Sequence, residues 1–222
     1  TGCGKTSLIN LIPRFYEPTK GEVLIDDIPI ETLRLVDLRK QIGLATQDVL
    51  LYSDTIEGNI AYGDSSIDQE EVEKFAKYSA ASDFISKMPE GYDTVVGERG
   101  VGLSGGQKQR ISLARALLKE PSILILDDTT SAVDMETESY IQKQLGSIDH
   151  KCTIFVVAYR ISSIKDSDVI LVLNDGHIVE QGTHDELLAK NGYYATVFRH
   201  QYGEYEQYTK QESGKEGYHG TK

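Results

Sequence analysis

The sequence predicts an α/β fold, in which a mostly helical insertion of about residues 50–118 interrupts a domain built on a parallel sheet. Two continuous apolar runs, at 122–127 and 153–158, are typical of parallel strands buried on both faces. Apolar residues at helical spacing occur before, between and after these runs, the first of them at 5–12. Strands that alternate with helices in this way favour a sheet covered by helices.

The elements before the insertion are short. A helix at 5–12 is followed by a turn at 17–21, a strand at 22–26, a helix at 36–41 and a second strand at 42–46. Within the insertion, Asp68 stands three residues before Glu71 and just ahead of an apolar helical pattern. This spacing predicts a capping box and therefore the start of a helix.

The elements after the two apolar runs complete the domain. Asn174-Asp175-Gly176 lies between the strand-like runs 169–173 and 177–181 and predicts a hairpin. Helices are predicted around 185–190 and 193–200. Residues 201–222 contain no aliphatic side chain, which predicts a polar C-terminal tail that is disordered or weakly helical. The folded domain is therefore expected to span residues 1–200.

Composition excludes several classes of protein. The chain has 222 residues, of which 39% are hydrophobic and 26% charged, as in a globular protein. The net charge of −12 argues against nucleic-acid binding through a basic surface. The longest apolar runs fall far short of the roughly 20 residues that span a bilayer. Two cysteines exclude a disulfide framework and suit a reducing compartment.

The chain begins with the end of a phosphate-binding loop of the pattern G-x-x-x-x-G-K-[ST]. Such glycines let backbone N–H groups surround phosphate oxygens, while Lys5 reaches the β- and γ-phosphates and Thr6 offers a hydroxyl to Mg²⁺. A chance glycine-rich loop is the alternative, but here the motif opens an apolar helical pattern. The predicted ATP-binding residues are Thr1, Gly2, Cys3, Gly4, Lys5, Thr6 and Ser7. Because the motif's first glycine would precede Thr1, we interpret the chain as an N-terminally truncated piece of a longer protein.

Two acids end the first apolar run. A nucleotide-binding site of this kind needs a carboxylate at the C-terminal end of a strand to hold Mg²⁺, and Asp127 fits that role. Paired acids in a solvated turn are the simpler interpretation when taken alone, but the phosphate-binding loop makes it less attractive.

The most specific motif is a pentapeptide made of Leu103, Ser104, Gly105, Gly106 and Gln107. Ser104 is placed to cap a helix of about 105–118, whose first N–H groups would approach an anion. An ordinary capped helix after a flexible loop is the alternative. The motif is followed by Lys108, Gln109 and Arg110 and lies about twenty residues before Asp127, a combination that is hard to obtain by chance.

These motifs resemble the nucleotide-binding domain of ABC transporters, particularly exporters, over residues 1 to about 200. The resemblance implies a P-loop NTPase core sheet with an inserted helical subdomain, ATP and Mg²⁺ as cofactors, and 103–107 as the signature that acts on a partner's ATP. It identifies Gln47 as the Q-loop residue, a catalytic and metal-binding position beside Thr6 and Asp127, and Asp134 as the D-loop aspartate. Residues 52–60 and 97–100 resemble exporter loops.

Two catalytic positions depart from the family pattern. The family usually has Glu, the general base, where this chain has Asp128, and a switch histidine where this chain has Tyr159. A phenol with a reference pKa of about 10 is neutral at pH 7 and cannot replace an imidazolium. Each change alone could be a tolerated substitution. Both would act on this chain's own ATP, whereas its signature is intact, so the pattern favours an impaired-site subunit of a heterodimer.

The leading interpretation is thus the motor domain of an ATP-driven exporter on the cytoplasmic face of the plasma membrane. Its expected partners are a second ABC subunit and a membrane-spanning domain upstream in the same chain, without nucleic acid. The alternatives are a homodimeric exporter ATPase with a slow site, a soluble ABC-type ATPase acting on nucleic acid or ribosomes, and a regulatory module without turnover.

Overall fold

The computed structural model describes residues 2–64, 66–97, 100, 102–148 and 151–213, with 204–213 described as backbone. The chain divides into two units, which are described one at a time: Thr6–Tyr159, and Thr1–Lys5 together with Arg160–Lys222. Across the described ranges, none of the helices combines the length and the apolar character that a bilayer crossing requires.

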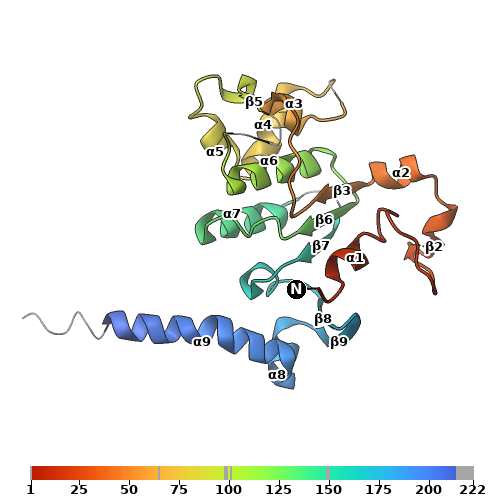
Figure 1. The fold of residues 1–222 in the computed structure, drawn as a ribbon, viewed down its shortest axis with the longest axis vertical. Helices are drawn as coiled ribbons and strands as arrows, with labels where there is room; N and C mark the ends of the chain where they lie inside the picture. The colour runs from red at the N-terminus through yellow and green to blue at the C-terminus, as the bar shows by residue number, and fades with distance from the viewer. Residues whose placement is uncertain (1, 65, 98–99, 101, 149–150, 214–222) are drawn as a thin grey trace, which may run out of the picture. The chain divides into compact units, whose positions relative to one another are not determined.

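The first unit alternates helices and strands as the sequence predicts (Figure 1). The first helix begins at Lys5, one residue before the first residue of the unit. The elements are α1 (Lys5–Ile9), β1 (Leu24–Ile25), β2 (Ile28–Pro29), η1 (Ile30–Thr32), α2 (Leu35–Lys40), β3 (Ile42–Ala45), β4 (Asp54–Thr55), α3 (Ile56–Ile60), α4 (Gln69–Tyr78), α5 (Ser82–Ile85), η2 (Gly91–Asp93), β5 (Val95–Val96), α6 (Gly105–Leu118), β6 (Ile123–Asp127), α7 (Met135–Leu145) and β7 (Thr153–Val157).

Three parallel strands in the order β3-β6-β7 form the sheet of this unit. The register pairs Ala45 with Leu126 and Asp127 with Val157, so all three strands end at one edge. The expectation that both apolar runs are buried on both faces is correct for β6 and wrong for β7, where Phe155 is 38% exposed. The reason lies in what covers each face: Ile154 and Val156 pack against the core under α6, whereas the other face is open at Phe155, and an apolar run does not reveal which face is covered.

The helical insertion packs on one face of this sheet through α6. In Figure 1, α6 lies between the sheet and the group formed by α3, α4 and α5. Alternate residues of β6 divide between the two faces: Leu124 and Leu126 join the core under α6, whereas Ile125 joins the core that contains Ile9 of α1. Gly43 of β3 lets α6 approach, because a Cβ there would lie 2.6 Å from a carbonyl oxygen of α6.

The insertion is mostly helical, as predicted, with a short antiparallel pair formed by β4 and β5. Asp68 stands at the N-cap position of α4, but in the described part of the chain its side chain makes no cap hydrogen bond, so the predicted capping box is wrong. The spacing of Asp68 and Glu71 marked the helix start without ensuring the side-chain geometry that a capping box needs.

A buried amide fastens the start of the insertion to α6. Asn59 is fully buried; its Oδ1 accepts from the Tyr52 N–H at 2.9 Å, and its Nδ2 donates to the carbonyl oxygens of Tyr52 and Thr55, both at 3.0 Å. Arg115 of α6 donates to the Asn59 carbonyl at 2.7 Å and to Oδ1 at 3.1 Å. Its guanidinium also lies over the stacked rings of Tyr52 and Tyr62, and burial lowers the pKa of Arg115.

Replacing Asn59 with Ala should lower the free energy of unfolding by about 2–4 kcal/mol, because several buried backbone and guanidinium groups lose their partner. Denaturant unfolding of the full-length protein, followed by a probe of this domain, measures the change. Gln69→Ala is the matched control: this exposed amide bonds Glu73 at 2.9 Å, and its loss should change stability by about 0.5 kcal/mol or less. Equal losses in the two variants would contradict the clamping role of Asn59.

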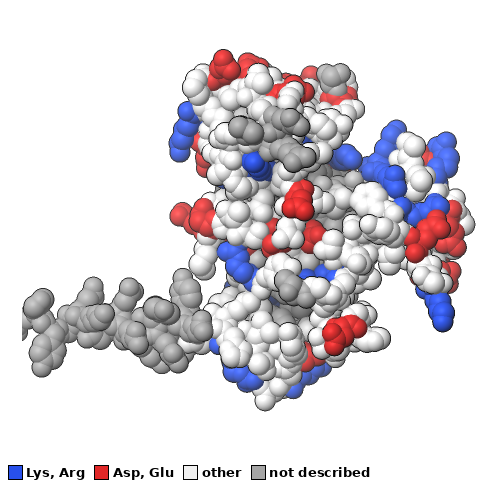
Figure 2. Space-filling view, in the orientation of Figure 1, with Lys and Arg blue, Asp and Glu red and all other residues white. Residues whose placement is uncertain are grey.

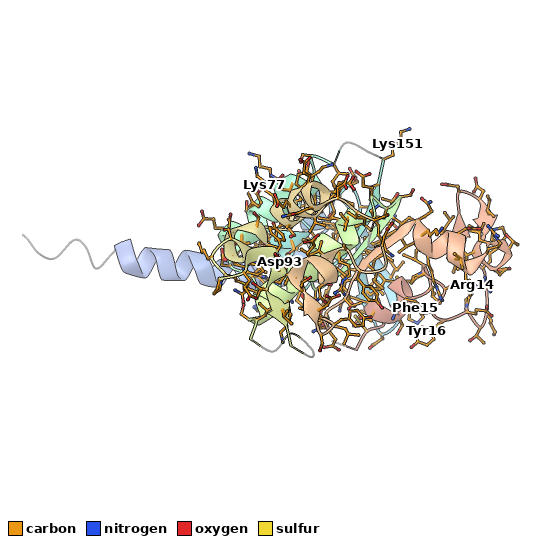
Figure 3. The ribbon with its side chains drawn as sticks, turned by 90° about the horizontal axis from the view of Figure 1, so that it is seen from above. Arg14, Phe15, Tyr16, Lys77, Asp93 and Lys151 are labelled. Atoms are coloured by element: carbon orange, nitrogen blue, oxygen red, sulfur yellow. The ribbon has the colours of Figure 1, made fainter. Side chains whose placement is uncertain are left out.

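A lobe of residues 13–40 extends from the sheet. Figure 2 shows its basic and acidic side chains close together, and Arg34 pairs with Asp37 at 2.6 Å. Arg14, with φ of +55°, donates to three carbonyl oxygens of residues 30–33, at 3.3–3.4 Å, and so holds the lobe together. Figure 3 places Arg14 beside Phe15 and Tyr16, whose rings are about half exposed or more.

The second unit contains η4 (Ile161–Ser163), a hairpin of β8 (Ile170–Asn174) and β9 (His177–Gly182), and two helices, α8 (His184–Lys190) and α9 (Tyr193–Ser213). The hairpin is confirmed, with both turn residues, Asp175 and Gly176, at positive φ. Thr183 and Glu186 form a capping box for α8. The backbone of the predicted polar tail is helical as far as Ser213, and residues 214–222 lie outside the described residues.

Candidate functional site

A pocket at the ends of β3 and β6 brings together the three predicted metal-binding residues. Thr6, Gln47 and Asp127 line a cavity of about 150 Å³, together with Ile9, Asn10, Leu44, Thr46 and Asp48. Asp127 ends β6 and is 5% exposed, and Gln47 follows the end of the neighbouring strand β3. The Thr6 hydroxyl donates to Asp127 Oδ2 at 3.1 Å, although 121 positions separate the two residues.

The donor set of this pocket suits Mg²⁺. Hydroxyl, carboxylate and amide oxygens are hard ligands, and Mg²⁺ is usually held by one or two carboxylates plus substrate phosphates and water. Within the described residues, no group of three or more His, Cys, Asp or Glu side chains is arranged to hold a metal ion. The oxygen atoms of Thr6, Gln47 and Asp127 are of the chemical type that such an ion prefers.

The glycines of the phosphate-binding motif adopt the backbone that the motif requires. Gly2 and Gly4 have φ of +80° and +95°, a region that a side chain makes unfavourable. Lys5 Nζ lies 3.5 Å from Cys3 Sγ, and α1 begins at Lys5, as the motif predicts. Ser7 is exposed on α1, and Thr1 lies outside the described residues.

The turn that follows β6 holds Asp128 in a strained backbone. Its φ is +51°, a left-handed conformation that costs a residue other than glycine about 1 kcal/mol or more. The Asp128 N–H donates to the Val157 carbonyl at the end of β7, at 2.9 Å, and the Asp128 carbonyl accepts from Ser131 Oγ at 3.0 Å. Tyr159, two residues beyond the end of β7, is 45% exposed.

Helix α6, which begins within the predicted signature at 103–107 and is called the signature helix, starts where the sequence predicts. Ser104 and Gln107 form a full capping box: Ser104 Oγ accepts from the Gln107 N–H at 3.2 Å, and Gln107 Oε1 accepts from the Ser104 N–H at 2.8 Å. Leu103 is half-buried against the core under α6, and Gly105 is exposed. Gly106 has a packing role as well, because a Cβ there would lie 2.6 Å from the Ala132 carbonyl oxygen. Of the neighbouring exporter-like loop at 97–100, residues 98 and 99 lie outside the described residues.

Asp134, predicted as a D-loop residue, caps helix α7. Its carboxylate accepts from the Thr137 N–H at 2.9 Å and from the Thr137 hydroxyl at 2.8 Å. These hydrogen bonds hold the pKa of Asp134 below its usual value. A lowered pKa means that the cap stabilises the fold above the unfolded-state pKa and loses that effect as pH falls through the folded-state pKa.

Sequence reasoning used Gln109 and Arg110 as spacing evidence and assigned them no role. The Gln109 amide is 6% exposed and bonds the turn that contains Asp128 and Ser131. Arg110 donates to the Ala80 carbonyl at 2.8 Å and lies over the Phe84 ring, and burial lowers its pKa. Their place next to the pentapeptide is the signal that could have marked them.

Comparison with known proteins agrees with these features. The family model described as ABC transporter matches residues 1–131. An ATP-dependent lipid A-core flippase of Pseudomonas fluorescens is 54% identical over 198 residues, which are 89% of this chain and 33% of the relative. A putative multidrug export ATP-binding/permease protein of Staphylococcus aureus is 52% identical over 89% of this chain and 34% of its own length.

Among solved structures, a bacterial Atm1-family ABC exporter with ATP bound superimposes with a TM-score of 0.88. It is 44% identical and is matched over 90% of this chain and 35% of its own chain. This chain thus spans about a third of the length of the relatives that it matches.

Proposed function

Because the chain belongs to the ABC transporter family, we propose that it is the ATP-hydrolysing motor domain of a membrane exporter. The observation that carries the proposal is the pocket at the ends of β3 and β6, where Thr6, Gln47 and Asp127 supply oxygen ligands at the end of a phosphate-binding motif. Relatives named as an ATP-dependent flippase and a multidrug export protein support the exporter assignment.

The residues divide the work as follows. Residues 1–7 hold the phosphates of ATP, with Lys5 as the cation on the β- and γ-phosphates. Thr6, Gln47 and Asp127 would hold Mg²⁺, which when bound would supply positive charge against the phosphates. Asp128, on the strained turn after Asp127, is the carboxylate available to accept a proton from the water that attacks the terminal phosphate.

The chain's own site is the weaker one in this proposal. Asp128 is one methylene shorter than the glutamate usual in the family, and Tyr159 cannot carry the charge of a histidine. The signature at 103–107 keeps its family residues and a complete capping box. We therefore propose a heterodimer, in which this signature completes the partner's better site. A homodimer with two slow sites is the alternative.

The proposed assembly includes a membrane-spanning domain and places this domain at the cytoplasmic face of the plasma membrane. The support is that the relatives are about three times as long as the matched segment, and one of them is named an ATP-binding/permease protein. A soluble ATPase acting on nucleic acid is disfavoured by the net charge of −12. A module without turnover would bind ATP and hydrolyse none.

Restoring the family residues, Asp128→Glu with Tyr159→His, should raise turnover at this chain's own site by about tenfold or more, because base catalysis contributes about 10²–10⁴-fold where it is well placed. The measurement is ATPase activity of the full-length assembly in lipid, with the partner's own base removed so that this site alone reports. Each single change should help less than the pair, since both act on one water and one phosphate.

The exposed Tyr140→His supplies a control for adding an imidazole elsewhere, and it should leave turnover unchanged. A double variant no faster than its parent would contradict the impaired-site proposal. An assembly with no ATPase activity in any of these forms would contradict the motor function itself.

A further inference from the structure

The buried side-chain amide of Gln109 connects the signature helix to the turn of residues 128–133, called the Asp128 turn. Gln109 lies on α6, four residues beyond Gly105, and its side chain is 6% exposed. Its Nε2 donates to the Asp128 carbonyl oxygen at 3.3 Å and to Ser131 Oγ at 3.2 Å, while its Oε1 accepts from the Ala132 N–H at 3.1 Å. Both ends of the amide are thus used on one turn.

That turn needs external support. Asp128 is held at φ of +51°, which a backbone other than glycine adopts only when its surroundings stabilise it. Gln109 and Ser131 both donate to the Asp128 carbonyl, and the Asp128 N–H bonds β7. Gln109 is thus one of the groups that hold the backbone of Asp128 in this conformation.

The same turn packs tightly on the signature. A Cβ on Gly106 would lie 2.6 Å from the Ala132 carbonyl oxygen, so the first turn of α6 and residue 132 are in direct backbone contact. Within the turn, the Thr130 hydroxyl donates to the buried Glu138 of α7 at 3.0 Å. The turn is therefore held between the signature helix and α7.

We propose that Gln109 is a positioning residue that fastens the signature helix to the Asp128 turn, so that the signature and the Asp128 carboxylate move as one body. Its catalytic consequence rests on the proposed function, in which the signature serves the partner's ATP and Asp128 serves this chain's own. Gln109 then links the two ATP sites through three hydrogen bonds.

Two substitutions separate the halves of the clamp. Gln109→Met keeps the length of the side chain and removes every hydrogen bond, whereas Gln109→Glu keeps an acceptor for the Ala132 N–H and loses the amide donor to Asp128. Ser112→Ala is the matched control, because Ser112 is equally buried on α6, one turn further along.

The first readout is hydrogen–deuterium exchange of the full-length assembly, which does not depend on activity. Gln109→Met should speed exchange of the amides of residues 128–133 by about tenfold, since the opened turn becomes more populated, and should leave β6 and the rest of α6 within about twofold. In Gln109→Glu the exchange of the Ala132 amide should speed up less than in Gln109→Met, because Glu keeps an acceptor for that N–H. The control should match the unchanged protein, and unchanged exchange in Gln109→Met overturns the clamp.

The second readout is the split between kcat and KM for ATP in the assembly whose partner lacks its own base, so that this chain's own site alone reports. Gln109→Met should lower kcat by about tenfold with KM within about twofold, and it should cancel the gain from Asp128→Glu with Tyr159→His. A freed turn with unchanged kcat overturns the positioning role. An assembly without any ATPase activity overturns the proposed function and the catalytic half of this inference, while the exchange comparison still decides whether Gln109 holds the turn.

Discussion

Replacing Gly105 with Asp should lower the ATPase activity of the full-length assembly by about 100-fold or more, whereas Asp128→Asn should lower it by about twofold or less. In the proposed heterodimer Gly105 faces the γ-phosphate of ATP in the partner's good site. Two like charges about 4 Å apart repel by about 4 kcal/mol at an effective dielectric constant of 20. Asp128 acts in a site that already contributes little, so amidating it removes little of the total.

The structure has room for a Cβ at residue 105. A Cβ on Gly105 would meet nothing closer than the Ala132 Cβ, at 3.5 Å, which is ordinary contact. Residue 105 is also the first residue of α6, where an acidic side chain is favourable toward the helix dipole. Gly106 is different, because a Cβ there would lie 2.6 Å from the Ala132 carbonyl oxygen.

Steady-state ATPase of the assembly in lipid ranks these variants. Gly105→Ala is the matched control: it adds the same Cβ without a charge and should cost far less than Gly105→Asp. Ser104→Ala should also be more damaging than Asp128→Asn, because it removes the hydroxyl of the signature. If Asp128→Asn is as damaging as Gly105→Asp, the heterodimer proposal fails and the homodimer with slow sites replaces it.

Lys5→Ala should weaken ATP binding at this chain's own site by about 30- to 100-fold. A hydrogen bond to a charged group contributes about 1.5–3 kcal/mol, and the lysine in this motif is the cation nearest the β- and γ-phosphates. The measurement is titration of labelled ATP into the full-length assembly whose partner carries a hydrolysis-dead site. One class of sites should keep its affinity while the other loses it.

Lys20→Ala provides the matched control, since Lys20 is exposed in the turn before β1 and should leave both affinities unchanged. Two classes of sites with unaltered affinity in Lys5→Ala would show that residues 1–7 do not hold the phosphates of ATP.

Local chemistry made some elements predictable from the sequence. The start of α6 was predicted because Ser104 is a strong N-cap residue, and the structure adds Gln107 as the second half of a capping box. The β8–β9 hairpin was predicted because Asp175 and Gly176 accept positive φ. The α4 capping box failed because a favourable spacing does not ensure side-chain geometry. The burial of both faces of β7 was wrongly predicted because an apolar run does not show which of its faces another element covers.

The candidate site also has features that short motifs predict and features that only packing decides. The sequence by itself predicted a nucleotide-binding role for Lys5, Thr6 and Asp127, because each lies in a short motif with its own physical logic. Only the tertiary structure decided that Thr6 bonds Asp127 across 121 positions, that Asp128 sits on a strained turn, and that the Gln109 amide holds that turn. The reason is that a buried polar group takes its partner from whatever segment packing brings within about 3 Å, and no local pattern records that choice.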